Sequence, residues 1–481
     1  MATTATPLSL YNTLTRRIEP LALGEPGRVR MYLCGVTVYD RAHVGHARTW
    51  VVFDALARYL EWADPSLSVT YVRNVTDVDD RIIERAAQQG ISSTELGDTM
   101  TQAMMDDSTA LGCRPPNVQP RATLHIPEMI EIIRTLEEKG IAYRASGDVY
   151  FDVSAFPAYG KLSHRRLDEM RAGARVEVDE QKRHPEDFAL WKGVKPGEPS
   201  WESPFGPGRP GWHIECSAMS TRYLGQPFDL HGGGEDLIFP HHENELAQSE
   251  GAAGVDFARH WMHISFLRIN EEKMSKSLGN FVTIRDAVTQ YPAEALRLHL
   301  LQTHYRSPME FSETGILEAQ SSLLRMYETL ARVGAAGPLD ASTASEDAAR
   351  CTKDFRESLQ DDFNTPRALA AMHEAVRAAN RLMDAGKTDE ARSTAAALRT
   401  VGGVFGLLQG EPEQVLSAWS ASRAEAAGIS PAEIERLIGE RKSARLSKDF
   451  KAADAIRGRL SDAGIDLKDH PDGTTSWSVR R

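Results

Sequence analysis

The sequence predicts an α/β protein with a Rossmann-like parallel sheet split by an inserted subdomain, then an α-helical bundle and a small C-terminal domain. Three observations support this prediction. Between residues 28 and 90, apolar runs of strand length alternate with segments of helical periodicity, the order that builds a doubly wound sheet. A Pro/Gly-rich stretch at 195–211 precedes a second strand-and-helix pattern, which begins at Phe228. Beyond Tyr291 the periodicity is almost wholly helical.

The expected elements follow from hydrophobic periodicity and from turn residues. The apolar run RVRMYLC predicts a buried strand, and apolar residues at helical spacing follow it after a turn. Strands are expected at 28–34, 67–75 and 228–230, and helices at 46–62, from about 79, at 240–250, 316–333 and 367–383. The expected divisions are 1–125 and 212–300 for the two halves of the sheet domain, 126–211 for the connective insertion, 301–410 for the bundle and 416–481 for the C-terminal domain, with a linker at 410–415.

Size and composition exclude several classes of protein. A chain of 481 residues with 41% hydrophobic and 26% charged residues is expected to form two to four globular domains, and it lacks a run apolar enough to cross a membrane. The first twenty residues lack the apolar core of a signal peptide, and four scattered cysteines suit a reducing compartment, so we expect a cytoplasmic protein. A net charge of −12 argues against a surface that binds polyanions everywhere, although short basic strips occur at 161–166, 182–183 and 440–448.

The first candidate motif, His43-Val-Gly-His46, lies between the first strand and its helix. Imidazoles and free backbone N–H groups at a helix start can receive phosphates, and Gly45 lets a nucleotide approach the backbone closely. The spacing of the two histidines alone fits a capping or packing role equally well.

The second motif is the polar segment Lys273-Met-Ser-Lys-Ser-Leu-Gly279. Two lysines flanked by hydroxyl groups and a glycine can hold a departing pyrophosphate, because charge-assisted contacts stabilise its negative charge. A lone lysine-rich loop is usually solvated surface, but this string is too specific for that interpretation to be favoured.

A third set of residues has the chemistry of metal ligands. It comprises Cys34, Cys216, His241 and Glu245, and the last two stand four residues apart on an expected helix, so that they face the same way. Residues so widely separated in sequence are more often packed than ligating. From the residues alone, both interpretations stay open.

Taken together, these segments resemble the cysteinyl-tRNA synthetase family of class I aminoacyl-tRNA synthetases. The resemblance rests on MYLCGVTVYDRAHVGHART, NVTDVDDRI, PEDFALWK, GRPGWHIECSAM, DLHGGGEDLIFPHHENELAQS, KMSKSLGN and DDFNTPRAL, in that family's order. The closing segments KDFKAADAIRGRL and DGTTSW resemble that family's C-terminal end. Nearly the whole chain is covered.

The resemblance implies an ATP site. His43 and His46 match the ATP-binding signature, with valine at 44 where isoleucine is common, and Lys276 of the lysine motif is expected nearest the phosphates. The implied catalytic residues are His43, His46, Lys273 and Lys276. The implied ATP contacts are Val36, Thr37, His43, Gly45, His46, Gly233, Asp236 and Lys276.

The resemblance also implies one Zn²⁺ per chain, held by Cys34, Cys216, His241 and Glu245. An open coordination position would bind the substrate as a thiolate, a bond that serine could not make. The implied cysteine-binding residues are Cys34, Thr76, Trp212, Cys216 and His241, although ordinary packing explains Trp212 equally well.

The implied reaction joins the carboxylate of L-cysteine to the α-phosphorus of ATP with the help of Mg²⁺, which releases pyrophosphate and forms cysteinyl-adenylate. Cysteine is then transferred to the terminal ribose of cysteine tRNA, which releases AMP. The expected partners are therefore ATP, L-cysteine and cysteine tRNA. No association with a membrane is expected, and the expected oligomeric state is a monomer. The bundle and the C-terminal domain would contact the tRNA, with Trp477 stacking on a base.

Two alternatives remain. A related ligase activates cysteine in the same way but joins it to an amino sugar in mycothiol synthesis. The motif Val38-Tyr-Asp-Arg-Ala-His43, without proline, and the C-terminal unit favour the synthetase. A non-catalytic tRNA-binding relative should have lost ligands or lysines, and none is missing from the sequence.

Overall fold

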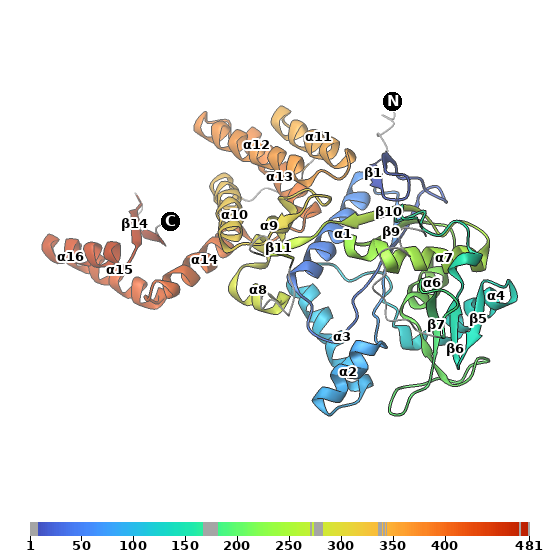
Figure 1. Cartoon of the computed structure of the whole chain (residues 1–481). Helices are drawn as coiled ribbons and strands as arrows, with labels where there is room; N and C mark the ends of the chain where they lie inside the picture. Colours follow the sequence, from blue (N-terminus) through green and yellow to red (C-terminus); the bar gives the residue numbers. More distant parts are fainter. Residues whose placement is uncertain are drawn as a thin grey trace.

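A four-stranded parallel sheet forms the centre of the N-terminal part of the protein (Figure 1). The computed structural model describes residues 8–166, 181–269, 272–273, 282–334, 339, 342, 344–470 and 473–479. The strand order is β10-β9-β3-β4, with bounds Arg28–Leu33 for β3, Ser68–Arg73 for β4, Phe228–Gly234 for β9 and Ala258–Ile264 for β10. Because β3 pairs directly with β9, with Met31 beside Leu230, the predicted split sheet is confirmed.

Side chains of β3 alternate between the two faces of the sheet, and each face packs in a different hydrophobic core. Met31 and Leu33 join one hydrophobic core, which includes α1 (Val44–Ala63) and extends into the helical bundle. Tyr32 and Cys34 point to the opposite face, because successive residues of a strand alternate. That second core contains α6 (Trp212–Leu224) and α7 (Glu243–Ala253), so Cys34 faces the two helices that carry Cys216 and Glu245.

The inserted subdomain follows the first half of the sheet domain. It begins with α4 (Ile126–Glu138) and contains the antiparallel sheet β5-β6-β7-β8. Its strands are Ala142–Ala145, Asp148–Phe151, Phe188–Gly193 and Gly208–Pro210. Helix α4 packs against both α6 and α7, so the insertion supports the helices beneath Cys34.

Smaller elements connect these units. The hairpin of β1 (Ser9–Asn12) and β2 (Arg17–Pro20) contacts β10 and was not predicted from the sequence. A three-stranded sheet, β12-β11-β13, comprises Leu267–Ile269 for β11, Glu272–Lys273 for β12 and Met309–Glu310 for β13. The remaining helical elements of this half are α2 (Asp80–Gln89), α3 (Ser93–Ala110) and the short turns η1 (Ala122–Leu124), η2 (Val153–Ala155), η3 (Glu235–Leu237) and η4 (Ile238–His242).

The C-terminal half is helical, as predicted. Its helices are α8 (Ile284–Gln290), α9 (Ala293–Leu301), α10 (Glu313–Val333), α11 (Glu346–Gln360), α12 (Thr365–Asp384), α13 (Thr388–Val404), α14 (Pro412–Ala426), α15 (Pro431–Leu446) and α16 (Phe450–Asp462). The linker expected at 410–415 is wrong in part, because Pro412 already stands in the first turn of α14, where its missing N–H costs nothing.

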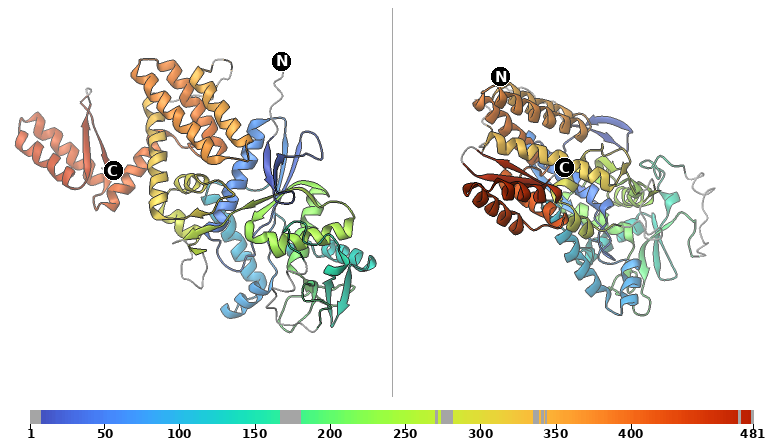
Figure 2. Two further views of the ribbon diagram at one scale, coloured as in Figure 1. Left: turned by 45° about the horizontal axis from the view of Figure 1, so that its top comes forward. Right: turned by 90° about the vertical axis from the view of Figure 1, so that its left-hand side faces the viewer.

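The last two helices and the hairpin of β14 (Ile465–Asp469) and β15 (Thr475–Val479) form a separate small core. This C-terminal unit projects from the bundle beyond α14 (Figure 2). Within the described ranges, the helices are all too short or too polar to cross a membrane.

Candidate active site

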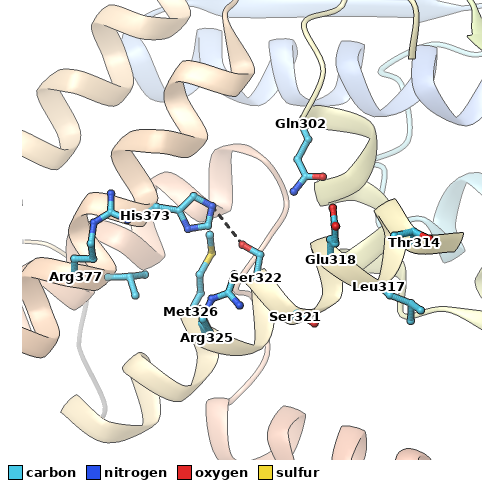
Figure 3. A pocket seen from close by; sticks show the side chains of 11 residues that line it. Gln302, Thr314, Leu317, Glu318, Ser321, Ser322, Arg325, Met326, His373 and Arg377 are labelled. Atoms are coloured by element: carbon cyan, nitrogen blue, oxygen red, sulfur yellow. Dashed lines mark hydrogen bonds between the residues drawn. The ribbon is translucent and has the colours of Figure 1, made fainter. Parts of the chain in front are cut away.

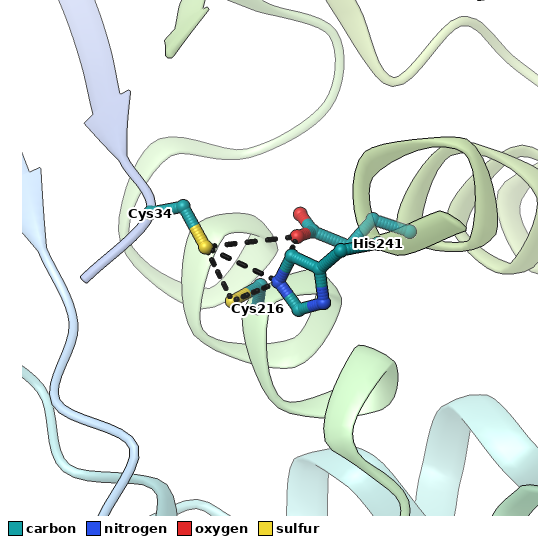
Figure 4. Close-up of side chains that lie close together, drawn as sticks. Cys34, Cys216 and His241 are labelled. Carbon is teal, nitrogen blue, oxygen red and sulfur yellow. Dashed lines mark hydrogen bonds and ion pairs between the residues drawn. The ribbon is translucent and has the colours of Figure 1, made fainter. Parts of the chain in front are cut away.

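Four potential ligand atoms converge beneath the C-terminal end of β3 (Figure 4). The sulfurs of Cys34 and Cys216 lie 3.5 Å apart, and Nε2 of His241 lies 3.2 Å from Cys34 and 3.7 Å from Cys216. Glu245 completes the group, with Oε1 at 2.7 Å from the same Nε2 atom. All four residues are buried, so the structure brings together the complete set of predicted metal ligands.

The chemistry of this cluster fits a zinc ion. With bonds of about 2.3 Å to sulfur and about 2.0 Å to nitrogen, zinc holds its ligand atoms roughly 3.3–3.8 Å apart. The two sulfurs and Nε2 of His241 lie 3.2–3.7 Å from one another, close to this range, whereas the 2.7 Å between Nε2 and Oε1 of Glu245 is a hydrogen-bonding distance. Burial opposes a charged imidazole, yet the charges of Cys34 and Glu245 raise the pKa of His241 to about 10. The cluster therefore favours a positive charge at its centre, which is what a metal ion supplies.

Two further histidines orient the ligands, and the sequence analysis missed both. Nδ1 of His213 lies 2.9 Å from Nδ1 of His241, and Nε2 of His231 lies 2.8 Å from Oε2 of Glu245. These contacts leave Nε2 of His241 and Oε1 of Glu245 facing the thiols. Ligands held by such partners bind metal more tightly. The only sequence signal was their position beside predicted residues, in the segments WHIEC and LHGGG.

A cavity of about 420 Å³ lies above the cluster, at the carboxyl ends of the strands. Eight predicted site residues line it: Cys34, Val36, Thr37, His43, Gly45, His46, Trp212 and Asp236. Trp212 stacks on His241 with ring centroids 4.0 Å apart, so its indole connects the cavity lining to the deeper ligands. The other lining residues were not predicted from the sequence, namely Gly35, Tyr39, Thr49, Trp50, Arg81, Gly234, Leu237, Ile264, Ser265, Phe266 and Leu267.

His43 and His46 form a capping box at the start of α1. The His43 side chain accepts a hydrogen bond from the Gly45 N–H at 3.1 Å, and Nδ1 of His46 accepts one from the His43 N–H at 3.2 Å. Their rings stack with centroids 3.8 Å apart. Burial, reinforced by His43, holds the pKa of His46 well below its usual range. The capping role left open by the sequence is therefore real, and it fixes both rings in the cavity wall.

Two other predicted contacts lie behind the wall. Thr76 is buried and pairs through its backbone with Val36 and Val38, and so supports the segment that lines the cavity. A side chain at Gly233 would come within 2.7 Å of His242, so this glycine allows β9 and the His242 ring to pack closely. Neither residue lines the cavity itself.

The lysine motif is only partly within the described residues. Lys276 lies outside them, and only the backbone of Lys273 is described, in β12. The chain beyond the motif returns to the ATP-binding signature, because Val44 N–H donates to the Val282 carbonyl at 3.1 Å and Ile284 N–H donates to the Ala42 carbonyl at 2.9 Å.

A larger cavity, of about 880 Å³, lies far from this chemistry, between α9, α10 and α12 of the bundle. Figure 3 shows Arg325, His373 and Arg377 around it, with the Ser322 hydroxyl 3.3 Å from the His373 ring. We call it the bundle groove.

The protein resembles characterised families along almost its whole length. Residues 20–321 match the family described as the class I (C) tRNA synthetase catalytic domain, residues 354–409 the DALR domain, and residues 430–477 the cysteinyl-tRNA ligase anticodon binding domain. The cysteine–tRNA ligase of Geobacter sulfurreducens is 53% identical over 98% of this chain and 100% of its own length. The chain belongs to the cysteinyl-tRNA synthetase family.

Another sequence relative is consistent with this family, and two solved structures are consistent with its fold. The cysteine–tRNA ligase of Halorhodospira halophila is 51% identical to this cysteinyl-tRNA synthetase over 98% of the chain and 100% of its own length. Among solved structures, methionyl-tRNA synthetase of Mycobacterium tuberculosis with methionyl-adenylate has a TM-score of 0.60 at 15% identity, covering 84% of this synthetase and 95% of that chain. The Agrobacterium radiobacter LeuRS-tRNA-LeuAMS complex has a TM-score of 0.59 at 11% identity, covering 82% and 86%. These structural likenesses support the class I synthetase fold.

Proposed function

We propose that this synthetase recognises cysteine through a zinc ion held by Cys34, Cys216, His241 and Glu245, and activates it with ATP in the cavity above. The observation that carries the proposal is the convergence of these four ligand atoms at the floor of a cavity whose wall carries His43 and His46. When bound, zinc would take the substrate thiolate as a further ligand beside the four protein atoms, a bond that the hydroxyl group of serine would not replace.

The chain's own residues supply the environment for that recognition. The hydrogen bond between the thiols lowers the pKa of Cys34 to about 6, which favours the anionic form that binds metals. Trp212 stacks on the His241 ring and so helps to hold this ligand in place beside the proposed amino-acid position. Thr76 holds the Val36 segment in place from behind, which supports a positioning role for this residue.

For ATP, we assign the cavity wall. His46, kept neutral by burial, and His43 offer ring N–H groups to the phosphates, while Asp236 stands in the same wall where a ribose hydroxyl could donate to it. Lys273 and Lys276, with magnesium, would neutralise the charge that develops on the leaving pyrophosphate. Val36, Thr37, Gly45 and Gly234 complete the proposed ATP surface, and Gly233 lies behind it in β9.

We assign transfer RNA to the helical half of the chain. The bundle groove carries Arg325 and Arg377, and such side chains bind phosphates. Trp477 donates to Oε1 of Glu435 at 2.8 Å and packs partly on the C-terminal core, so stacking on a base would require this contact to break. We further propose a cytoplasmic monomer, in keeping with four buried cysteines that form no disulfide.

The test is cysteine-dependent exchange of pyrophosphate into ATP, with serine as the competitor, followed by transfer of labelled cysteine to cysteine tRNA or to an amino sugar. Exchange with cysteine alone and label on tRNA are the expected results. Label on the sugar would favour the mycothiol ligase, and absence of exchange by zinc-loaded protein would refute the proposal.

A further inference from the structure

Arg48 is a buried arginine on α1, two residues after His46, and it binds four backbone carbonyl groups. Its Nη1 donates to Ser265 at 2.8 Å and to Phe266 at 3.1 Å. Its Nη2 donates to His304 at 3.0 Å and to Ser307 at 2.8 Å. The residue is 1% exposed, and burial lowers the pKa of its guanidinium to about 10, against the opposing effect of the Glu235 charge.

The first two carbonyl groups belong to the wall of the proposed ATP cavity. Ser265 and Phe266 line the same cavity as His43 and His46. The segment that carries the other two carbonyl groups holds this wall from outside, because Ser265 N–H donates to the Tyr305 carbonyl at 2.8 Å and Met309 N–H donates to the Phe266 carbonyl at 3.0 Å. Arg48 thus joins three segments that come together only in the folded chain.

Phe266 also leads directly into the strand pair before the lysine motif. It precedes β11, and β11 pairs with β12, where Arg268 stands beside Lys273. The segment after the motif, at Val282–Ile284, pairs with the backbone around the start of α1. Both described flanks of the lysine motif are therefore attached to the helix that carries the other ATP signature, one through Arg48 and the other through the backbone.

We infer that Arg48 is a positioning residue for the activation of cysteine by ATP. It holds the Ser265–Phe266 part of the cavity wall at a fixed place relative to His43 and His46. The inference rests on the proposed ATP site. Arg48 does not line the cavity, so it acts through the two carbonyl-bearing residues and not on ATP itself.

A contribution to folding stability does not by itself explain why position 48 carries an arginine. A buried charge costs several kcal/mol in solvation, and an apolar side chain of similar volume is often as stable or more so. A guanidinium, however, is planar and presents its donors in a rigid fork, so it can hold two pairs of carbonyl groups at one mutual orientation. Lysine keeps the charge but has no such fork.

The experiment compares Arg48→Lys with the parent protein in ATP–pyrophosphate exchange. Displacement of a site by about 1 Å can cost about 100-fold in rate, so we expect kcat/KM for ATP to fall about 10- to 100-fold. The KM for cysteine and the zinc content should stay within about twofold of the parent, because the metal cluster lies on the other face of β3. An unchanged kcat/KM for ATP would overturn the inference, while an inactive parent would instead refute the proposed function.

Arg297 provides a matched control. It is also 1% exposed, also binds carbonyl groups, those of Phe405 and Leu111, and also contacts α1, through Asp54 at 2.6 Å. It ties α1 to the bundle, away from the cavity. Arg297→Lys should lower Tm as Arg48→Lys does but leave the KM for ATP unchanged. Equal effects of the two substitutions on kcat/KM for ATP would mean that Arg48 serves stability only.

A measurement on the parent protein covers the case in which Arg48→Lys fails to fold. Bound ATP should slow hydrogen exchange at the amides of Ser265 and Met309, whose carbonyl partners lie in the segments that Arg48 joins, because a ligand stabilises the closed form that binds it. Cysteine alone should leave these amides unchanged. Equal exchange with and without ATP would contradict the inference.

Discussion

His213 and His241 face each other through their Nδ1 atoms at 2.9 Å, so that the opposite nitrogen of His241 points at Cys34 and Cys216. One of the two Nδ1 atoms must carry the shared hydrogen, and this bond fixes how the His241 ring lies. The geometry of the proposed zinc site therefore depends on a residue that is not a ligand.

Replacing His213 with phenylalanine should weaken zinc binding about 10- to 100-fold, the usual effect of removing a hydrogen-bond partner from a metal ligand. Phenylalanine keeps the ring that packs on Trp212 and Phe188 but has no nitrogen. Competition with a chromophoric chelator measures the change. His125→Phe, at a buried histidine bonded to Tyr223 outside the cluster, is the control and should keep parental affinity. Equal affinities for all three proteins would contradict the prediction.

Loss of Arg325 should weaken tRNA binding without affecting cysteine activation. Arg325→Ala removes one cation from the bundle groove, so the KM for tRNA should rise and the slope of log K against log salt should decrease by about 1. Arg332 on the same helix bonds Asn380 at 2.8 Å and does not line the groove. A parallel change in Arg332→Ala would show that the groove is not the contact.

Asp362 should couple the bundle to the N-terminal hairpin. Its carboxylate accepts hydrogen bonds from the Tyr11 N–H at 2.8 Å, from the Tyr305 hydroxyl at 2.5 Å and from Nε of Arg306 at 2.7 Å. Asp362→Asn keeps a residue that tolerates the positive φ of 54° found here, but it removes the charge. Hydrogen bonds to charged groups contribute about 1.5–3 kcal/mol each, so thermal unfolding should shift to lower temperature.

The consequence of Asp362→Asn for function should be selective. Aminoacylation of tRNA should fall more than pyrophosphate exchange, because in the proposed arrangement tRNA contacts both halves of the chain at once whereas ATP and cysteine bind in the cavity of the N-terminal half. Equal losses in the two assays would contradict this account. Asp361→Asn, at an exposed neighbour, serves as the control.

Acid should destabilise the protein through His299 on α9. Burial lowers the pKa of this histidine to about 4, whereas an unfolded histidine has a pKa of about 6.5. The unfolded chain therefore takes up a proton first, and stability is lost as the pH falls from about 6.5 towards 4, by about 2 kcal/mol at pH 5. His299→Gln should show a smaller fall in Tm between pH 7.5 and 5 than the parent. Parallel pH profiles of Tm would exclude His299 as a source of acid sensitivity.

Many of the strands and helices were predicted correctly from the hydrophobic periodicity of the sequence. The strand expected at 28–34 is β3, the helix at 316–333 lies within α10, and the helix at 367–383 lies within α12. The hairpin of β1 and β2 was missed because each strand has only four residues and the hairpin is stabilised through contact of β1 with β10, which the local sequence does not encode. Pro412 was predicted to lie in a linker, although proline is also common in the first turn of a helix.

The four potential metal ligands were found from their chemistry and from family resemblance, and the structure brings them together. His213, His231 and Arg48 were not found, because their importance lies in which atoms they reach across the fold. A histidine next to a tryptophan, or an arginine in a helix, carries no local sign of such a partner. The roles assigned to Lys273 and Lys276 remain predictions.

The pairing of β3 with β9 also bears on how the protein is made. Cys34 and Glu245 are 211 residues apart. A chain that emerges from the ribosome in order exposes the first cysteine long before the helix that carries the carboxylate exists. At synthesis rates of about 5–20 residues per second, this interval lasts about 10–40 seconds. During that time the inserted subdomain can fold before β9, the central partner of β3, has been made. The proposed zinc ion would therefore find all of its ligands only after the two halves of the sheet have joined.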